Sequence, residues 1–170
     1  MLLVPLAFSA RRRELLGFSP RSFLLGLGEG LVAAALLIPF FLLVVRAFWR
    51  FKGGDVGAEE VIRAALFQIA VVAIPEELFF RAFLQADLEE FAKRKVKLLG
   101  ARLGWGWLVA TALFALAHLP ARPEPAALLV FFPGLAFGWL WARRQSLAGP
   151  VIFHAISNVV LNLWVTPGLF

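Results

Sequence analysis

Five apolar segments, separated by short polar stretches, make up most of the chain. They cover residues 24–49, 61–84, about 104–119, 126–141 and 147–165. A transmembrane helix needs about 20 predominantly apolar residues. The pattern therefore predicts an all-α fold, a polytopic transmembrane helical bundle of about five spans, with residues 1–170 forming a single transmembrane domain.

The composition supports a membrane protein. Of the 170 residues, 61% are hydrophobic and 16% are charged, whereas soluble proteins carry about 25% charged residues. The absence of cysteine excludes disulfides and thiolate metal sites. The formal net charge of +6 would suggest a nucleic-acid partner for a soluble protein. Here the cations lie between apolar segments, so we expect membrane lipid and no nucleic acid as their partner.

The distribution of these cations predicts an orientation. Most of them lie before the first span, after the second span and after the fourth: Arg11, Arg12, Arg13, Arg21, Lys93, Arg94, Lys95, Lys97, Arg102, Arg143 and Arg144. Because cytoplasmic loops are enriched in lysine and arginine, we expect a cytoplasmic N-terminus. As the location we expect a bacterial or archaeal plasma membrane. Residues 1–10 are too short to span, and we interpret them as an interfacial segment.

Glu29 lies among three glycines near the start of the first span. It marks the membrane edge if the full span begins at Leu31. Alternatively, the glycines line a close approach of two helices and Glu29 faces the interior of the bundle.

The second span contains the unusual sequence Pro75-Glu76-Glu77-Leu78-Phe79-Phe80-Arg81. An ionisable group at membrane depth costs about 2.5–3.5 kcal/mol on insertion scales. Glu77 and Arg81 are four residues apart, so on a helix they lie on one face and can pair. Glu76 lies about 100° around the helix from Glu77 and has no partner within its own segment.

Three further polar residues lie in other apolar segments. His118 ends one span, and His154 and Asn158, four residues apart on a shared helix face, lie in the last. A lone histidine in a membrane helix is often a packing residue, and an intrahelical pair such as Glu77–Arg81 is often structural. Together with Glu76 the three further polar residues are most easily hidden from lipid if they converge, which predicts a buried polar cavity.

These residues resemble the motifs of the CPBP family of intramembrane proteases, which includes the CAAX prenyl-protein endopeptidases and the bacteriocin-processing or Abi enzymes. The family motif E-E-x-x-x-R matches Glu76, Glu77 and Arg81; F-x-x-x-H matches Phe114 and His118; and H-x-x-x-N matches His154 and Asn158. Phe131, Gly134 and Gly138 fit the glycine-bearing helix before the third motif. The similarity covers about residues 69–162, a predicted catalytic core. In two departures, Ala82 replaces the usual glycine and one clear span precedes the motif helix.

The resemblance implies a helical bundle around a cavity open to one leaflet, and hydrolysis of a peptide bond close to the membrane in a peptide or protein substrate, prenylated or not. No serine or cysteine lies beside a histidine in the motifs, so water is the expected nucleophile. We expect Glu76 to act as general base and His118 to help position or deprotonate the water. His154 and Asn158 would donate hydrogen bonds to the oxyanion. Glu77, Arg81 and Phe114 would support the site.

Zinc is the mechanistic alternative. Glu76, His118 and His154 can bind zinc with water in the fourth position. The H-E-x-x-H motif is absent, however, and Asn158 is a poor zinc ligand. Ligand chemistry therefore favours a glutamate-dependent mechanism without a cofactor.

Two functions from other classes are also compatible with the sequence. One is a non-enzymatic immunity or adaptor protein that binds a peptide or a membrane partner. The other is a proton-coupled carrier, which inverted repeats would favour; the sequence shows none.

Overall fold

The computed structural model describes residues 19–48, 55–121, 123 and 125–165. They form five helical segments that match the five apolar segments of the sequence. The first is α3 (Pro20–Phe48), and the third is α7 (Trp105–Leu116). The fourth joins the 3₁₀-helix η3 (Pro125–Val130) to α8 (Phe131–Arg144), and the fifth joins α9 (Ala148–Val160) to the π-helix η4 (Leu161–Val165).

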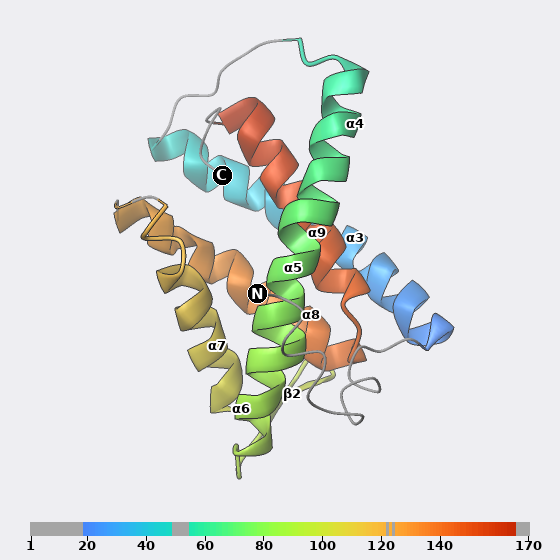
Figure 1. Cartoon of the computed structure of the whole chain (residues 1–170), viewed down its shortest axis with the longest axis vertical. Helices are drawn as coiled ribbons and strands as arrows, with labels where there is room; N and C mark the ends of the chain where they lie inside the picture. Colours follow the sequence, from blue (N-terminus) through green and yellow to red (C-terminus); the bar gives the residue numbers. More distant parts are fainter. Residues whose placement is uncertain (1–18, 49–54, 122, 124, 166–170) are drawn as a thin grey trace.

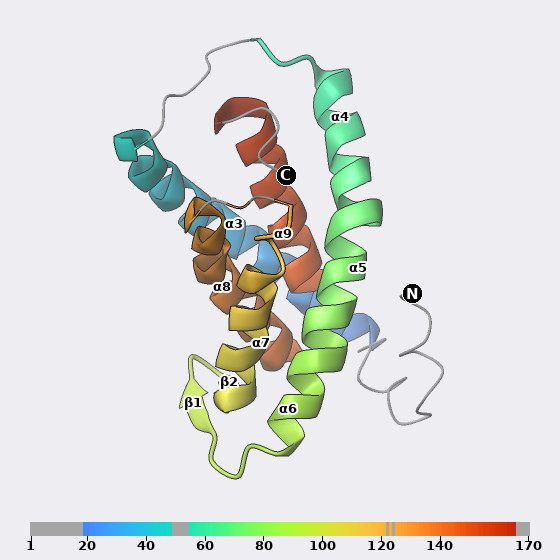
Figure 2. The ribbon, with the colours of Figure 1, turned by 60° about the vertical axis from the view of Figure 1, so that its left-hand side comes forward.

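The second segment is a long continuous helix that changes type along its length. It comprises α4 (Ala58–Phe67), the π-helix η1 (Gln68–Ala73), α5 (Ile74–Glu77), the π-helix η2 (Leu78–Gln85) and α6 (Ala86–Glu90). Figures 1 and 2 show this green helix running along the whole length of the molecule. Pro75, which cannot donate a backbone hydrogen bond, lies in the first turn of α5. The two glutamates therefore lie on a short α-helical turn between two π-helical stretches, and such stretches are frequent at functional sites.

A small β-hairpin connects the second and third segments, which the all-α prediction did not include. Strands β1 (Val96–Leu98) and β2 (Ala101–Leu103) pair antiparallel. The two residues between them, Leu99 and Gly100, have φ values of 45° and 89°. Positive φ at both central positions is the requirement of a type I′ turn, whose twist matches that of the strands.

Glu89 joins this hairpin region to the start of α7. Its carboxylate accepts hydrogen bonds from the backbone N–H groups of Gly104, at 2.8 Å, and Trp107, at 2.9 Å. The first N–H groups of a helix have no partner within the helix. A carboxylate at this position satisfies them and complements the helix dipole.

The helices pack around one apolar core. Helix α9 packs against α3, α8 and η1, and α7 packs against α8 and η2. The core consists of Ala34, Phe114, Phe137, Leu140 and Phe153, which come from α3, α7, α8 and α9. Of the polar motif residues, His154 and Asn158 lie on α9, and His118 lies in the turn that follows α7.

Glycines allow α3 and α9 to approach closely. A Cβ atom on Gly30 would lie 2.4 Å from the carbonyl oxygen of Gly149 and 2.4 Å from Ile152, whereas one on Gly28 would have no atom within 4 Å. Glu29 forms ion pairs with Arg143, at 3.0 Å, and with Arg144 at the end of α8. The glycine-lined close approach, which belongs to one of the two interpretations of this region, is therefore present. The other interpretation, with Glu29 at the membrane edge, stays a prediction.

One helix among the described residues is long and apolar enough to cross a membrane by length and composition, over Pro20–Leu43. The shorter apolar helices are Trp105–Leu116 and Ala148–Trp164. The prediction that all five segments span the membrane stays a prediction. The proposed interfacial segment, residues 1–10, lies outside the described residues.

Candidate active site

The pair predicted between Glu77 and Arg81 is present at the centre of the bundle. Arg81 Nε donates to Glu77 Oε2 at 3.0 Å, and both side chains are fully buried. Arg81 also donates from Nη1 to the hydroxyl of Thr111 at 3.3 Å, and its guanidinium lies over the Phe114 ring, 5.0 Å from the centroid. A buried ion pair needs such additional contacts because both charges have lost their water.

Glu77 also contacts His154, which the sequence did not predict. His154 Nδ1 lies 2.8 Å from Glu77 Oε1, so the carboxylate bonds the arginine with one oxygen and the imidazole with the other. An ionised carboxylate only accepts hydrogen bonds, so Nδ1 carries the proton. The His154 ring is stacked on Phe137, with ring centroids 4.7 Å apart and planes at 13°. Glu77 and Phe137 thus fix the orientation of this ring.

The Nε2 edge of the His154 ring is directed at Glu76. His154 Nε2 lies 3.9 Å from Glu76 Oε2, which is too long for a direct hydrogen bond but is a distance that a water molecule can bridge. The Glu76 side chain is 34% exposed, whereas that of Glu77 is fully buried. Glu76 Oε2 is shielded from solvent and has no hydrogen-bond partner among the described residues. Two adjacent glutamates therefore differ in kind: Glu77 is fully engaged and Glu76 has free acceptor capacity.

His118 lies in the turn that follows α7. Its Nδ1 donates to the carbonyl oxygen of Phe114 at 2.8 Å, which leaves Nε2 free in the neutral ring. His118 is near enough to Glu76 for a Coulombic interaction between them. The Phe114 ring contacts both histidines edge-on, with centroid distances of 4.8 Å to His118 and 5.9 Å to His154.

Asn158 lies one turn beyond His154 on α9 and bonds to a residue that the sequence analysis did not select. Its Nδ2 donates to Gln68 Oε1 at 2.9 Å, and the two residues are 5% and 4% exposed. Gln68 is a polar residue inside the otherwise apolar first half of the second span. That signal was available from the sequence, but the helical spacing did not connect Gln68 with the glutamates.

The described residues contain no group of three His, Asp or Glu side chains close enough to hold a metal ion. Glu76, His118 and His154, the ligands of the zinc alternative, therefore do not form a ligand set in this arrangement. His154 offers Nε2 alone, because Nδ1 is bonded to Glu77.

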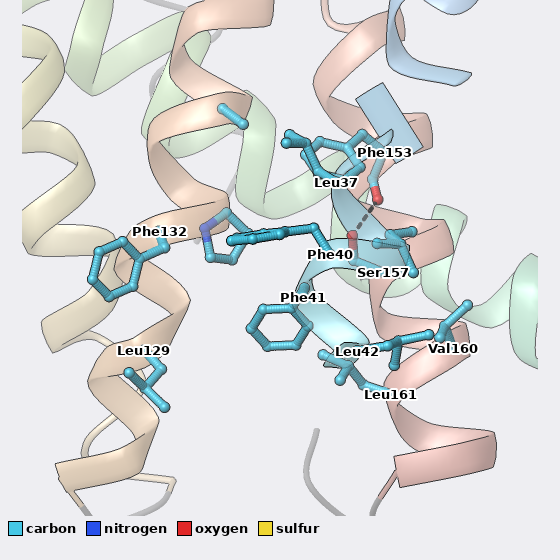
Figure 3. A pocket seen from close by; sticks show the side chains of 13 residues that line it. Leu37, Phe40, Phe41, Leu42, Leu129, Phe132, Phe153, Ser157, Val160 and Leu161 are labelled. Carbon is cyan, nitrogen blue, oxygen red and sulfur yellow. Dashed lines mark hydrogen bonds between the residues drawn. The ribbon is translucent and has the colours of Figure 1, made fainter. Parts of the chain in front are cut away.

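An apolar cavity of about 620 Å³ lies between α3, α8 and α9. Figure 3 shows Leu129 and Phe132 facing Phe40, Phe41 and Leu42 across it. Phe153 and Ser157, which directly precede His154 and Asn158, form part of the wall. The Ser157 hydroxyl donates to the carbonyl oxygen of Phe153 at 2.8 Å, so it is already satisfied. This cavity suits a hydrocarbon chain; the predicted polar cavity around Glu76 stays a prediction.

Buried carboxylate, imidazole and amide groups in a largely apolar helical bundle mark a functional site of a membrane protein. A match to a protein family identifies the class of enzyme. The family model described as type II CAAX prenyl endopeptidase Rce1-like matches residues 58–160, more than half of the chain. The chain belongs to this family of integral membrane proteases, which confirms the resemblance to the CPBP enzymes. No curated protein and no solved structure matches the chain.

Proposed function

We propose that the protein hydrolyses a peptide bond at the membrane by means of a water molecule activated by Glu76. The observation that carries this proposal is the contrast between the two adjacent glutamates. Glu77 holds Arg81 and His154, whereas Glu76 is partly exposed and its shielded Oε2 has no partner among the described residues. A general base must be near the proton it takes and free to accept it.

In the proposed reaction, water lies between Glu76 and the histidines. The free Nε2 of His118 can accept one hydrogen of the water and Glu76 the other. The water oxygen then bonds to the carbonyl carbon of the scissile peptide as Glu76 takes the proton. When the C–N bond breaks, this proton passes to the leaving nitrogen.

His154 and Asn158 would stabilise the negative charge that develops on the carbonyl oxygen. Glu77 accepts the Nδ1 proton of His154, and the Glu76 carboxylate lies 3.9 Å from Nε2. His154 donates to the oxyanion from Nε2 in the doubly protonated form of the ring, in which both ring nitrogens carry hydrogen. Asn158 donates one amide hydrogen to Gln68 and retains a second for the oxyanion. Donors held in place before the reaction contribute about 10²–10³ each to kcat.

The apolar cavity supports a lipidated substrate. Phe153 and Ser157, which line the cavity, directly precede His154 and Asn158 on α9. A hydrocarbon chain in the cavity would therefore hold its attached peptide near this helix. A cavity of this size is within the usual range for small-molecule sites, about 300–1,000 Å³. We propose that the lipid of the substrate occupies this cavity. From the distribution of the cations we also propose that the N-terminus of the enzyme lies in the cytoplasm.

A cleavage assay with purified protein tests the proposal. Peptides that end in a Cys-aliphatic-aliphatic-X sequence, with and without an attached prenyl group, are incubated with the protein in ¹⁸O-labelled water. We expect cleavage of the prenylated peptide, with the label in the new carboxyl group found by mass spectrometry. Failure to cleave either peptide or a wider panel of membrane-proximal peptides would count against the function.

A further inference from the structure

The buried contact between Gln68 and Asn158 joins two helical segments inside the bundle. Gln68 begins the π-helix η1, and Asn158 lies on α9. The bond from Asn158 Nδ2 to Gln68 Oε1 is 2.9 Å long and shielded from solvent. A buried amide hydrogen bond is costly to leave unmade, so Gln68 strongly restricts the orientation of the Asn158 side chain.

The orientation matters because the two ends of an asparagine amide have opposite chemistry. The NH₂ end donates two hydrogen bonds, and the oxygen only accepts. Asn158 donates one amide hydrogen to Gln68 Oε1. Because the amide group is planar, this bond also fixes the direction of the second N–H of Asn158. Rotation of the amide by half a turn would place Oδ1 against Gln68 Oε1, two acceptors that repel each other. In the observed arrangement, with Gln68 Oε1 as the acceptor, Gln68 holds Asn158 in the amide orientation that it needs to act as a donor.

The path of the second helical segment brings Gln68 to this position. In an α-helix, at about 100° per residue, residues nine apart point to opposite sides. Gln68 and Glu77 are nine apart, yet both contact α9, through Asn158 and His154 respectively. Between them lies η1, whose i→i+5 hydrogen bonds give more residues per turn and rotate Gln68 toward α9.

We propose that Gln68 is a positioning residue for hydrolysis, which acts by holding the Asn158 amide with its NH₂ group available to the oxyanion. The inference rests on the proposed function. It adds to the site a residue outside the three motifs, at the end of η1 farther from the glutamates.

The test compares two glutamines that undergo the same change. Gln68→Met retains the size of the side chain and removes the acceptor. Gln85→Met is the matched control, because Gln85 lies on the same long helix, is fully buried and donates to a carbonyl oxygen, that of Gly138 at 3.1 Å. With a fluorogenic prenylated peptide, we expect Gln68→Met to lower kcat by at least about tenfold with KM within about twofold, as for a weakened oxyanion donor. Gln85→Met should change kcat by less than about twofold.

A double-mutant cycle separates positioning from packing. If Gln68 acts through Asn158, then Gln68→Met should not lower kcat further in a protein that already carries Asn158→Ala. Gln68→Glu, which retains an acceptor oxygen, should keep more activity than Gln68→Met. If Gln68→Glu does not fold because of its buried charge, the double-mutant cycle alone provides the test.

Three results would overturn the inference. These are equal kcat values for Gln68→Met and Gln85→Met, losses that multiply in the double variant, or an unchanged kcat for Asn158→Ala. Glu76→Gln, measured in the same assay, separates this inference from the proposed function. If Glu76→Gln is inactive while any of the three results is found, the role of Gln68 is wrong and the Glu76-dependent reaction stands.

Discussion

Glu76 and Glu77 are adjacent in the sequence but differ in their surroundings, since Glu77 is fully buried and Glu76 is partly exposed. The sequence predicted the Glu77–Arg81 pair because residues four apart share a helix face. It also predicted that Glu76, about 100° away, would lack a partner in its own segment. The contact of Glu77 with His154 could not be predicted in this way, since it depends on how α9 packs against α5.

Glu77→Gln should therefore destabilise the protein. The neutral amide leaves the fully buried Arg81 without its counter-charge, and breaking a buried pair costs about 3–5 kcal/mol. It also weakens the support of His154, so residual activity should fall as well. Thermal unfolding in detergent, followed by tryptophan fluorescence, measures the first effect. A melting temperature equal to that of the wild type would show that the pair does not stabilise the fold.

At the level of elements, the apolar pattern predicted where the five helical segments lie but not their internal geometry. The π-helices η1 and η2 flank the two glutamates, and the hydrophobic periodicity of the sequence does not predict them. For this reason Gln68 was not assigned to the site, although it is a visible polar residue in an apolar stretch. The β-hairpin was also not predicted, because its strands are three residues long and too short for an alternating pattern.

The contact of α3 with α9 gives a second prediction. Gly30→Ala places a Cβ atom 2.4 Å from the backbone oxygen of Gly149. Backbone cannot move aside as a flexible side chain can, so we expect a loss of about 1–3 kcal/mol from overpacking. Gly28→Ala is the control, because nothing lies within 4 Å of its Cβ position and alanine favours a helix. Equal melting temperatures for the two variants would contradict the close approach.

At the scale of the whole molecule, α3, α8 and α9 border an open apolar cavity. Leu129 lines the cavity and is 39% exposed, whereas its neighbour Leu128 is 38% exposed and is not part of the lining. Leu129→Trp should displace about two methylene groups of a bound chain, at about 0.8 kcal/mol each. We therefore expect kcat/KM for a prenylated peptide to fall about tenfold, and Leu128→Trp to leave it unchanged. Equal effects of both substitutions would remove the cavity from the proposal.

Metal dependence is a further property of the whole protein. A zinc enzyme loses its metal-bound hydroxide when it is stripped, whereas water activated by Glu76 needs protein groups alone. Prolonged chelation should leave cleavage intact, and metal analysis of active protein should find no stoichiometric zinc. Loss of activity with two unrelated chelators, restored by zinc alone, would instead assign Glu76, His118 and His154 as ligands.

The most direct test of the account is the activity of Glu76→Gln in purified, folded protein. The substitution retains the size of the side chain and removes its ability to take a proton from water. Because Glu76 is partly exposed and does not hold the Arg81 pair, its melting temperature should stay close to that of the wild type. We predict that cleavage of the prenylated peptide falls below detection. Cleavage at a rate near that of the wild type would contradict the assignment of Glu76 as the general base.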